Sequence, residues 1–109
     1  MELERKENGW KFHPYIPGAL VINVGDTLQI LSNRKYKSAE HRVRTTSTQS
    51  RVSIPIFTIP KPTEIIGPLP HLVDKEGTCF REFVFQDYMT NFFSNAHEGK
   101  KSLDFAMLP

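Results

Sequence analysis

The feature that most constrains this chain is the way its apolar residues fall into short β-branched runs that end at glycine or proline. Residues 19–24, Ala-Leu-Val-Ile-Asn-Val, follow Gly18 and end before Gly25. A run of this length and composition favours a strand buried on both faces over a helix. Proline-rich residues 60–70 exclude a helix there. The chain is therefore predicted to be mainly β before its C-terminal third.

Two further strands are predicted after this run. Residues 38–44 and 51–59 form a hairpin joined by the polar loop 45–50. Pro55 cannot donate a hydrogen bond to a strand ladder, which indicates an edge, a bulge or a strand end. Residues 27–32 fit a short helix capped by Asp26 and also fit strand alternation, so periodicity leaves this piece open. Residues 32–34, Ser-Asn-Arg, predict a turn.

The two ends of the chain differ from its middle. Residues 1–17 predict an extended lead-in because prolines interrupt them. In the C-terminal third, helical spacing and a stop at Gly99 predict one amphipathic helix docked on the β core, with apolar residues Phe85, Tyr88, Met89, Phe92, Phe93 and Ala96.

Length and charge bound the classes of function. A chain of 109 residues holds one domain at most, and its formal net charge of +2 is too mild to favour nucleic acid as the partner. The basic residues Arg34 to Arg51 are read as a solvated face. The single cysteine, Cys79, excludes a disulfide framework, and no run is long enough to span a bilayer. We expect a cytoplasmic protein with neither a nucleic-acid nor a membrane partner.

Residues 41–53 carry the most chemical information. Arg51 and Ser53 lie two apart on one strand face, where a guanidinium and a hydroxyl can grip a carboxylate together. His41 lies across the hairpin and could ligate a metal that holds the other end of the same acid. Taken alone, His41 also fits a structural or surface histidine, and Arg51 fits a surface ion-pair partner.

A longer pattern surrounds these residues. Residues 17–43, PGALVINVGDTLQILSNRKYKSAEHRV, and residues 51–55, Arg-Val-Ser-Ile-Pro, resemble the C-terminal region of plant 2-oxoglutarate (2OG) and Fe(II)-dependent dioxygenases. The resemblance covers about residues 10–106. Residues 65–70, 87–88 and 97–106 are most similar to the feruloyl-CoA ortho-hydroxylase and scopoletin hydroxylase group of coumarin-forming enzymes.

The resemblance implies a fold, a reaction and a site. The fold is mainly β, part of a double-stranded β-helix (a cupin-like jelly roll) with a C-terminal α-helix. His41 would be the distal histidine ligand of Fe(II), Arg51 and Ser53 would bind the distal carboxylate of 2OG, and Phe57 would line the substrate pocket. The enzyme would use O2 to hydroxylate a small phenylpropanoid- or coumarin-type metabolite while 2OG gives succinate and CO2, with ascorbate as a supporting reductant.

The family's other two iron ligands come from a His-x-Asp motif, which does not occur in this chain. The resemblance therefore implies that residues 1–109 are the C-terminal part of the dioxygenase domain. We expect the isolated chain to be inactive, since a facial iron site needs all three ligands. The alternative is a non-catalytic binding module that retains the carboxylate grip. In either case exposed sheet edges favour self-association.

Overall fold

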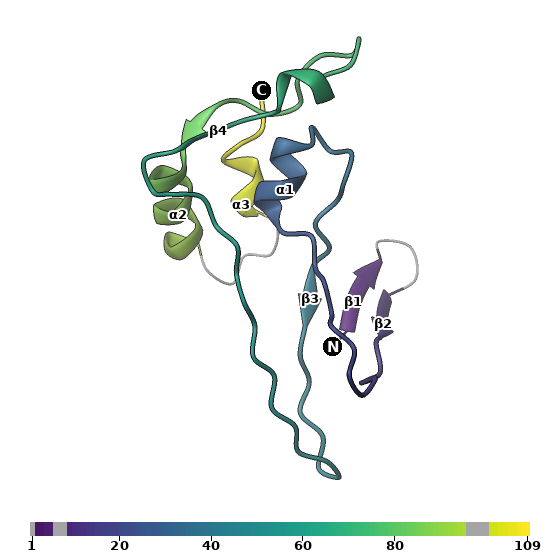
Figure 1. Cartoon of the computed structure of the whole chain (residues 1–109). Coiled ribbons are helices and arrows are strands. Elements are labelled where there is room, and N and C mark those ends of the chain that lie inside the picture. Colours follow the sequence, from purple (N-terminus) through teal and green to yellow (C-terminus); the bar gives the residue numbers. More distant parts are fainter. Residues whose placement is uncertain (1, 6–8, 96–100) are drawn as a thin grey trace. The chain divides into compact units, whose positions relative to one another are not determined.

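The computed structural model describes residues 2–5, 9–95 and 101–109 (Figure 1). The chain divides into two compact units. Unit 1 comprises residues 1–22 and 39–58, and unit 2 comprises residues 23–38 and 59–109. No helix among the described residues is long and apolar enough to cross a membrane.

The elements are short and alternate along the chain. Their bounds are β1 Glu2–Arg5, β2 Gly9–Phe12, α1 Asp26–Leu31, β3 His41–Arg42, β4 Ile65–Ile66, the 3-10 helix η1 Pro70–Leu72, β5 Phe83–Val84, α2 Phe85–Ser94 and α3 Lys101–Asp104.

Unit 1 is built on a three-stranded antiparallel sheet in the order β2-β1-β3. β1 lies in the centre, with Leu3 opposite Lys11 on one side and opposite His41 on the other. The predicted extended lead-in is thus a hairpin of β1 and β2. Its long-range partner, β3, brings His41 to the edge of this sheet.

The predicted strands after Gly18 are not formed among the described residues. Residues 19–25 have no strand structure, and Leu20 and Ile22 are 90% and 89% exposed, so the prediction of a strand buried on both faces is wrong. Of the predicted hairpin 38–59, only β3 is a strand. Residues 43–58 run out and double back in Figure 1 without a hydrogen-bonded ladder. A strand needs a second strand to pair with, and among the described residues neither segment forms a strand ladder.

Unit 2 begins with the segment whose structure periodicity left open, and it is a helix, α1. Gly25 is its N-cap residue and Asp26 its first residue. The predicted turn at 32–34 follows, with Asn33 and Arg34 at φ 49° and 70°. The Asn33 side chain bridges this turn to a distant loop: Nδ2 donates to Gly77 O (3.1 Å) and Oδ1 accepts from Cys79 N (2.8 Å). One amide therefore holds together segments more than forty residues apart.

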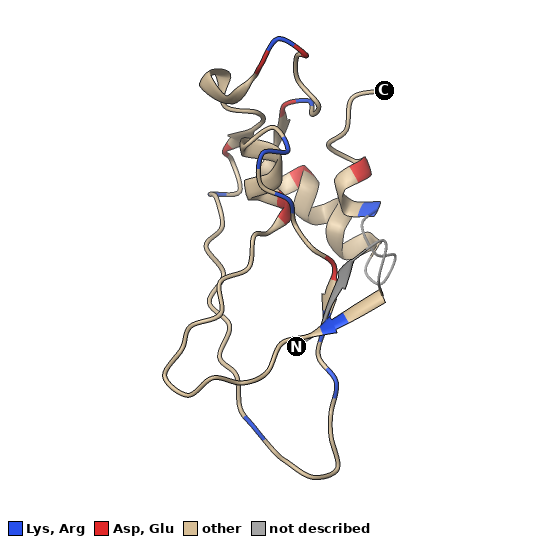
Figure 2. Ribbon diagram, turned by 90° about the vertical axis from the view of Figure 1, so that its right-hand side faces the viewer, with Lys and Arg blue, Asp and Glu red and all other residues tan. Residues whose placement is uncertain are grey.

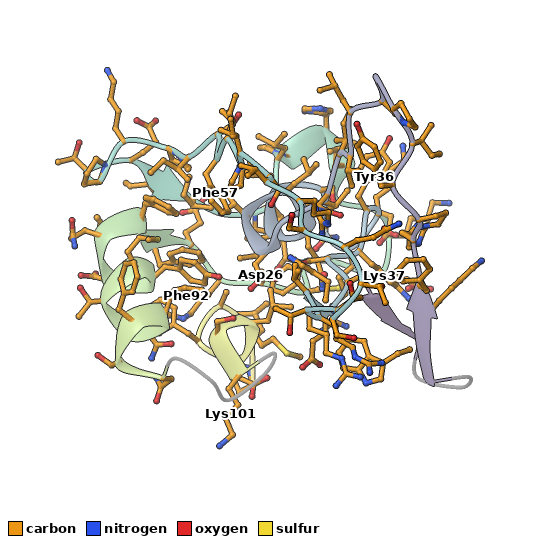
Figure 3. All side chains as sticks on the ribbon, turned by 90° about the horizontal axis from the view of Figure 1, so that it is seen from below. Asp26, Tyr36, Lys37, Phe57, Phe92 and Lys101 are labelled. Atoms are coloured by element: carbon orange, nitrogen blue, oxygen red, sulfur yellow. The ribbon has the colours of Figure 1, made fainter. Side chains whose placement is uncertain are left out.

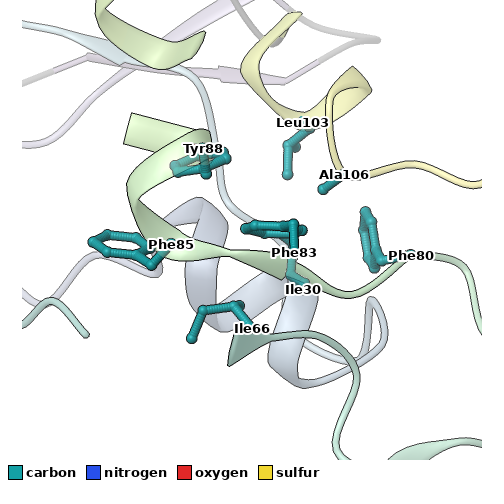
Figure 4. Packing of buried hydrophobic residues seen from close by; sticks show 8 residues of the cluster. All are labelled: Ile30, Ile66, Phe80, Phe83, Phe85, Tyr88, Leu103 and Ala106. Carbon is teal, nitrogen blue, oxygen red and sulfur yellow. The ribbon is translucent and has the colours of Figure 1, made fainter. Parts of the chain in front are cut away.

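The core of unit 2 lies between α1, α2, α3 and the two-stranded sheet of β4 and β5 (Figure 4). Its buried residues are Ile30, Ile66, Phe80, Phe83, Phe85, Tyr88, Leu103 and Ala106. Half of these residues are aromatic, namely Phe80, Phe83, Phe85 and Tyr88, and aromatic side chains bury large apolar areas. Phe83 stacks on Tyr88 with ring centroids 5.7 Å apart and meets Phe105 edge-on at 5.5 Å.

The C-terminal helix is confirmed over residues 85–94 as α2, whose Phe85 and Tyr88 face the core. The predicted continuation through Ala96 to the stop at Gly99 lies outside the described residues. Contrary to the prediction of a single helix, α3 follows at Lys101. The mainly β, jelly-roll fold is confirmed only in part, since the described strands are two to four residues long and close no double-stranded β-helix.

Candidate functional site

His41 is the one predicted metal ligand, and it lies exposed on β3. Its Nδ1 is 3.2 Å from Ala39 O. A carbonyl oxygen only accepts hydrogen bonds, so a hydrogen bond here has its proton on Nδ1, and in the neutral ring the lone pair is then on Nε2. That tautomer is the one a histidine needs to bind a metal through Nε2.

The neighbour of His41 shows which face of the sheet each side chain occupies. The Arg42 guanidinium carbon lies 4.0 Å from the centroid of the Trp10 ring, across the central strand β1. Successive residues of a strand point to opposite faces. The contact of Arg42 with Trp10 therefore directs His41 to the other face of the sheet. Sequence reasoning missed this pair because Trp10 and Arg42 are 32 residues apart in the sequence and meet only through the sheet.

Arg51, Ser53 and Phe57 lie on the returning segment of unit 1, and all three are exposed. In an extended chain residues two apart point the same way about 7 Å apart, so Arg51 and Ser53 share a side. Phe57 is 79% exposed. The structure places His41, Arg51 and Ser53 in one unit, and among the described residues no hydrogen bond or ion pair joins His41 to Arg51 or Ser53.

The electrostatics of this segment suit an anion. Residues 41–58 contain Arg42, Arg44 and Arg51 and no acidic residue. Figure 2 shows the same contrast, with blue but no red on the long extended segments. A carboxylate that approached Arg51 would meet no nearby acidic side chain of the same segment, and its charge would be complemented by the guanidinium.

A complete iron site is not formed by the residues that the structure describes, since none of them group as three or more His, Cys, Asp or Glu side chains. The tautomer of His41 fits one ligand of such a site. The described residues offer no second or third ligand beside His41, so no iron-dependent step is assigned to this chain alone. Arg51 and Ser53 need no metal to bind a carboxylate, and their chemistry fits 2OG.

A second polar group lies in unit 2, and sequence reasoning did not identify it. Asp26 Oδ2 accepts hydrogen bonds from Tyr88 Oη (3.0 Å) and from Ser102 Oγ (2.9 Å). Asp26, labelled in Figure 3, is half-buried. Burial and then the nearby Asp26 charge raise the pKa of Tyr88 above its ordinary value. The group joins α1, α2 and α3, and its role is structural because both donors are satisfied by one carboxylate.

The remaining sequence candidates have structural roles. Cys79 is half-buried and packs against the core of unit 2. Arg34, from the basic set, lies 5.3 Å from the Phe80 ring centroid and also contacts the Met107 sulfur. These contacts show Arg34 packing on apolar side chains of unit 2.

Residues 1–60 match the family model described as the 2OG-Fe(II) oxygenase superfamily. His41, Arg51, Ser53 and Phe57 all lie within this match. Among curated proteins, the chain is 65% identical over 102 residues to a scopoletin 8-hydroxylase of Arabidopsis thaliana, covering 92% of this chain and 29% of that protein. It is 50% identical over 100 residues to a feruloyl CoA ortho-hydroxylase of Ipomoea batatas, covering 91% of this chain and 28% of that protein.

Two solved structures also match this chain over nearly its whole length. The crystal structure of JOX2 in complex with 2OG, Fe, and JA matches with a TM-score of 0.86 and 34% identity, over 99% of this chain and 32% of that one. A dioxygenase for auxin oxidation in rice matches with a TM-score of 0.85 and 28% identity, over 98% of this chain and 37% of that one. The chain spans less than a third of the length of the two curated relatives. On this evidence the chain belongs to the 2OG-Fe(II) oxygenase superfamily.

Proposed function

We propose that these residues are the C-terminal part of a 2OG- and Fe(II)-dependent dioxygenase that hydroxylates a small phenylpropanoid- or coumarin-type plant metabolite, such as feruloyl-CoA. The observation that carries the proposal is the pair Arg51 and Ser53, exposed on one side of an extended segment that contains no acidic residue. The identities to hydroxylases of scopoletin and feruloyl CoA support the substrate class. The other partner is O2, and the location is the cytoplasm without nucleic-acid or membrane binding.

Four residues of the chain have separate parts in this proposal. The Arg51 guanidinium and the Ser53 hydroxyl hold the distal carboxylate of 2OG, while His41 presents Nε2 as one metal ligand. Phe57 offers an apolar wall to the substrate. When Fe(II) and 2OG are bound in a complete site, they supply the oxidising chemistry: O2 is consumed, 2OG becomes succinate and CO2, and the substrate gains a hydroxyl group.

A chimera tests the catalytic part of the proposal. The scopoletin 8-hydroxylase of Arabidopsis thaliana receives this chain in place of its matching 102 residues. We expect the chimera to hydroxylate scopoletin, and we expect His41→Ala in the chimera to abolish turnover and Fe(II) binding. Arg44→Ala, at another exposed residue of the same unit, is the control for truncation of a side chain. A folded chimera that stays active with His41→Ala would refute the assignment of His41.

The isolated chain tests the carboxylate grip without any metal. Isothermal titration with 2OG compares the wild type with Arg51→Ala, Arg51→Lys and Ser53→Ala. Loss of a charge-assisted two-point contact costs about 1.5–3 kcal/mol, so Arg51→Ala should weaken binding roughly 10- to 100-fold. Arg51→Lys should keep only part of the wild-type affinity for 2OG because an ammonium cannot form the two-point contact. Equal affinities for all four proteins would contradict the grip.

A non-catalytic binding module is the second candidate function. It is favoured by the lack of a three-residue metal group among the described residues. We infer that the isolated chain has no hydroxylase activity and that its exposed strand edges permit self-association. An anaerobic Fe(II) titration with 2OG tests the first inference, since a stoichiometric visible charge-transfer band from the isolated chain would overturn it.

A further inference from the structure

The segment that leads from α1 to β3 is held near its end by a side chain of the helix. Gln29 Oε1 accepts a hydrogen bond from Ser38 N at 2.7 Å, across nine residues of sequence. Both residues are half-buried, where a hydrogen bond is stronger than in open water. Ser38 ends the segment 23–38 of unit 2, and the chain then continues into unit 1. Gln29 therefore fixes the point at which the chain leaves this segment.

The helix that carries Gln29 gives this contact a rigid base. Ile30, the next residue of α1, is 1% exposed and belongs to the core of unit 2. The C-cap residue Ser32 is also buried, and its Oγ accepts a hydrogen bond from Tyr36 N at 3.1 Å. Side chains of α1 and of its cap thus accept from two backbone N–H groups on the way to β3. A close-packed interior resists displacement, so the Gln29 amide starts from a fixed position.

A second hydrogen bond continues this path to the predicted metal ligand. Ala39 O lies 3.2 Å from His41 Nδ1, and this contact is exposed. Because the peptide bond is planar, only the φ and ψ torsions of Ser38 and Ala39 separate the held N–H from this carbonyl. An exposed hydrogen bond is easily lost to water, so it persists only where its acceptor is kept in place. Release of Ser38 would free the Ala39 carbonyl to turn away from the imidazole.

We propose that Gln29 is a positioning residue for His41: by holding Ser38 N, its amide oxygen keeps the preceding carbonyl where it accepts from Nδ1. The inference rests on the proposed role of His41 as an iron ligand, since the tautomer with its lone pair on Nε2 is the one that binds a metal. Partners that orient a metal ligand contribute about 10- to 100-fold to metal affinity. Gln29 acts through one intervening carbonyl, so we expect about 10-fold, the lower end of that range.

Substitutions of similar size isolate the acceptor oxygen of Gln29. Gln29→Met keeps the length and the helix propensity of the side chain but has no oxygen, whereas Gln29→Glu keeps an acceptor. Gln86→Met makes the same chemical change at an exposed residue of α2 and is the matched control. Gly67→Ala, whose Cβ would lie 2.6 Å from Glu82 Cγ, destabilises unit 2 by another route and controls for a merely structural effect.

The first measurement uses the full chain without metal. Long-range proton–nitrogen NMR spectra at about pH 9, where imidazole is neutral, show which ring nitrogen carries the proton. The His41 signal is assigned by its loss in His41→Ala, and in the wild type the proton should be on Nδ1. Gln29→Met should move it toward Nε2, while Gln29→Glu and both controls should keep the wild-type tautomer. A folded Gln29→Met with an unchanged tautomer overturns the proposal, as does a wild type that carries the proton on Nε2.

The second measurement uses the chimera with scopoletin 8-hydroxylase, in which we expect a complete iron site. Anaerobic equilibrium dialysis measures its dissociation constant for Fe(II). Gln29→Met should weaken Fe(II) binding about 10-fold, and Gln29→Glu should recover most of the affinity because a carboxylate also accepts from Ser38 N. The two controls should bind Fe(II) like the unsubstituted chimera. Equal affinities for Gln29→Met and the unsubstituted chimera would contradict the positioning role.

The two measurements separate failure of this inference from failure of the proposed function. An unsubstituted chimera that binds no Fe(II) refutes the iron-ligand role of His41, whereas the tautomer in the metal-free chain still decides whether Gln29 orients that ring. If His41→Ala abolishes Fe(II) binding and Gln29→Met leaves it unchanged, only the inference about Gln29 is wrong. Circular dichroism verifies the folding of each variant, and Gln29→Ala removes the same acceptor if Gln29→Met does not fold.

Discussion

The phenol of Tyr88 donates a hydrogen bond to Asp26 Oδ2 at 3.0 Å, which joins the first turn of α1 to the middle of α2 across 62 residues of sequence. Ser102 donates to the same oxygen from α3. Three helices, each too short to be stable alone, are thereby held by one carboxylate. These hydrogen bonds fix the positions of the three helices of unit 2 relative to one another, although the helices have only four to ten residues.

Removal of the carboxylate should destabilise unit 2 strongly. Asp26→Ala leaves two buried hydroxyl donors without an acceptor, and we expect a loss of about 2–4 kcal/mol in the free energy of unfolding. Asp26→Asn keeps one acceptor oxygen and should cost about half as much. Urea unfolding followed by far-UV circular dichroism measures both, with exposed Asp104→Asn as the control for loss of a charge. If Asp26→Ala and the control have equal free energies of unfolding, the Asp26 carboxylate does not stabilise the fold.

Unit 2 should lose stability in alkali. Burial and the neighbouring Asp26 charge raise the pKa of Tyr88 in the folded state above the ordinary value of 10.0. Folding then favours the protonated phenol, so its contribution is complete below pH 10.0 and declines as the pH rises from there toward the raised pKa. Thermal unfolding between pH 8 and 12 should show this decline in the wild type and a shallower one in Tyr88→Phe. Identical slopes for the two proteins would rule out Tyr88 as the source.

The Asn33 amide should be required in both its donor and its acceptor roles. Asn33→Asp keeps the acceptor for Cys79 N but loses the donor to Gly77 O, and should cost about 1–2 kcal/mol. Asn33→Ala loses both bonds and also places a Cβ-bearing residue without a local hydrogen bond at φ 49°, which should cost more. Asn33→Gly relieves the backbone strain, so it should be more stable than the alanine variant. Chemical denaturation measures the order of stability of the three variants. If Asn33→Ala were more stable than Asn33→Gly, backbone strain at this positive φ would be contradicted.

A methyl group at Gly67 should be poorly tolerated. A Cβ there would lie 2.6 Å from Glu82 Cγ and 3.3 Å from Glu82 Cα, so the loop beside β4 would have to move. We expect Gly67→Ala to destabilise unit 2 by about 1–3 kcal/mol. Glu82→Ala removes the Cγ atom and should recover part of this loss in the double variant, although the backbone contact remains. A double-mutant cycle on thermal unfolding measures the coupling between residues 67 and 82. If the two losses of stability are strictly additive, the methyl group does not clash with the Glu82 side chain.

The sequence by itself determined the local chemistry and the family pattern. His41, Arg51 and Ser53 could be singled out because their residue types and spacing carry meaning without any contact, and the turn at 32–34 and the helix of Phe85 and Tyr88 follow from local signals. These features can be recognised in the sequence because propensity and spacing act within a few residues.

Only the tertiary structure decided which segments have partners. The apolar run at 19–24 and the segment at 51–58 read as strands, yet strand formation needs a second strand, and neither segment finds one among the described residues. In the same way, Asp26 could be read as a helix cap, whereas folding uses its carboxylate to accept hydrogen bonds from Tyr88 and Ser102. Contacts across 62 and 76 residues leave no periodic trace in the sequence, which is why structure was needed to find them.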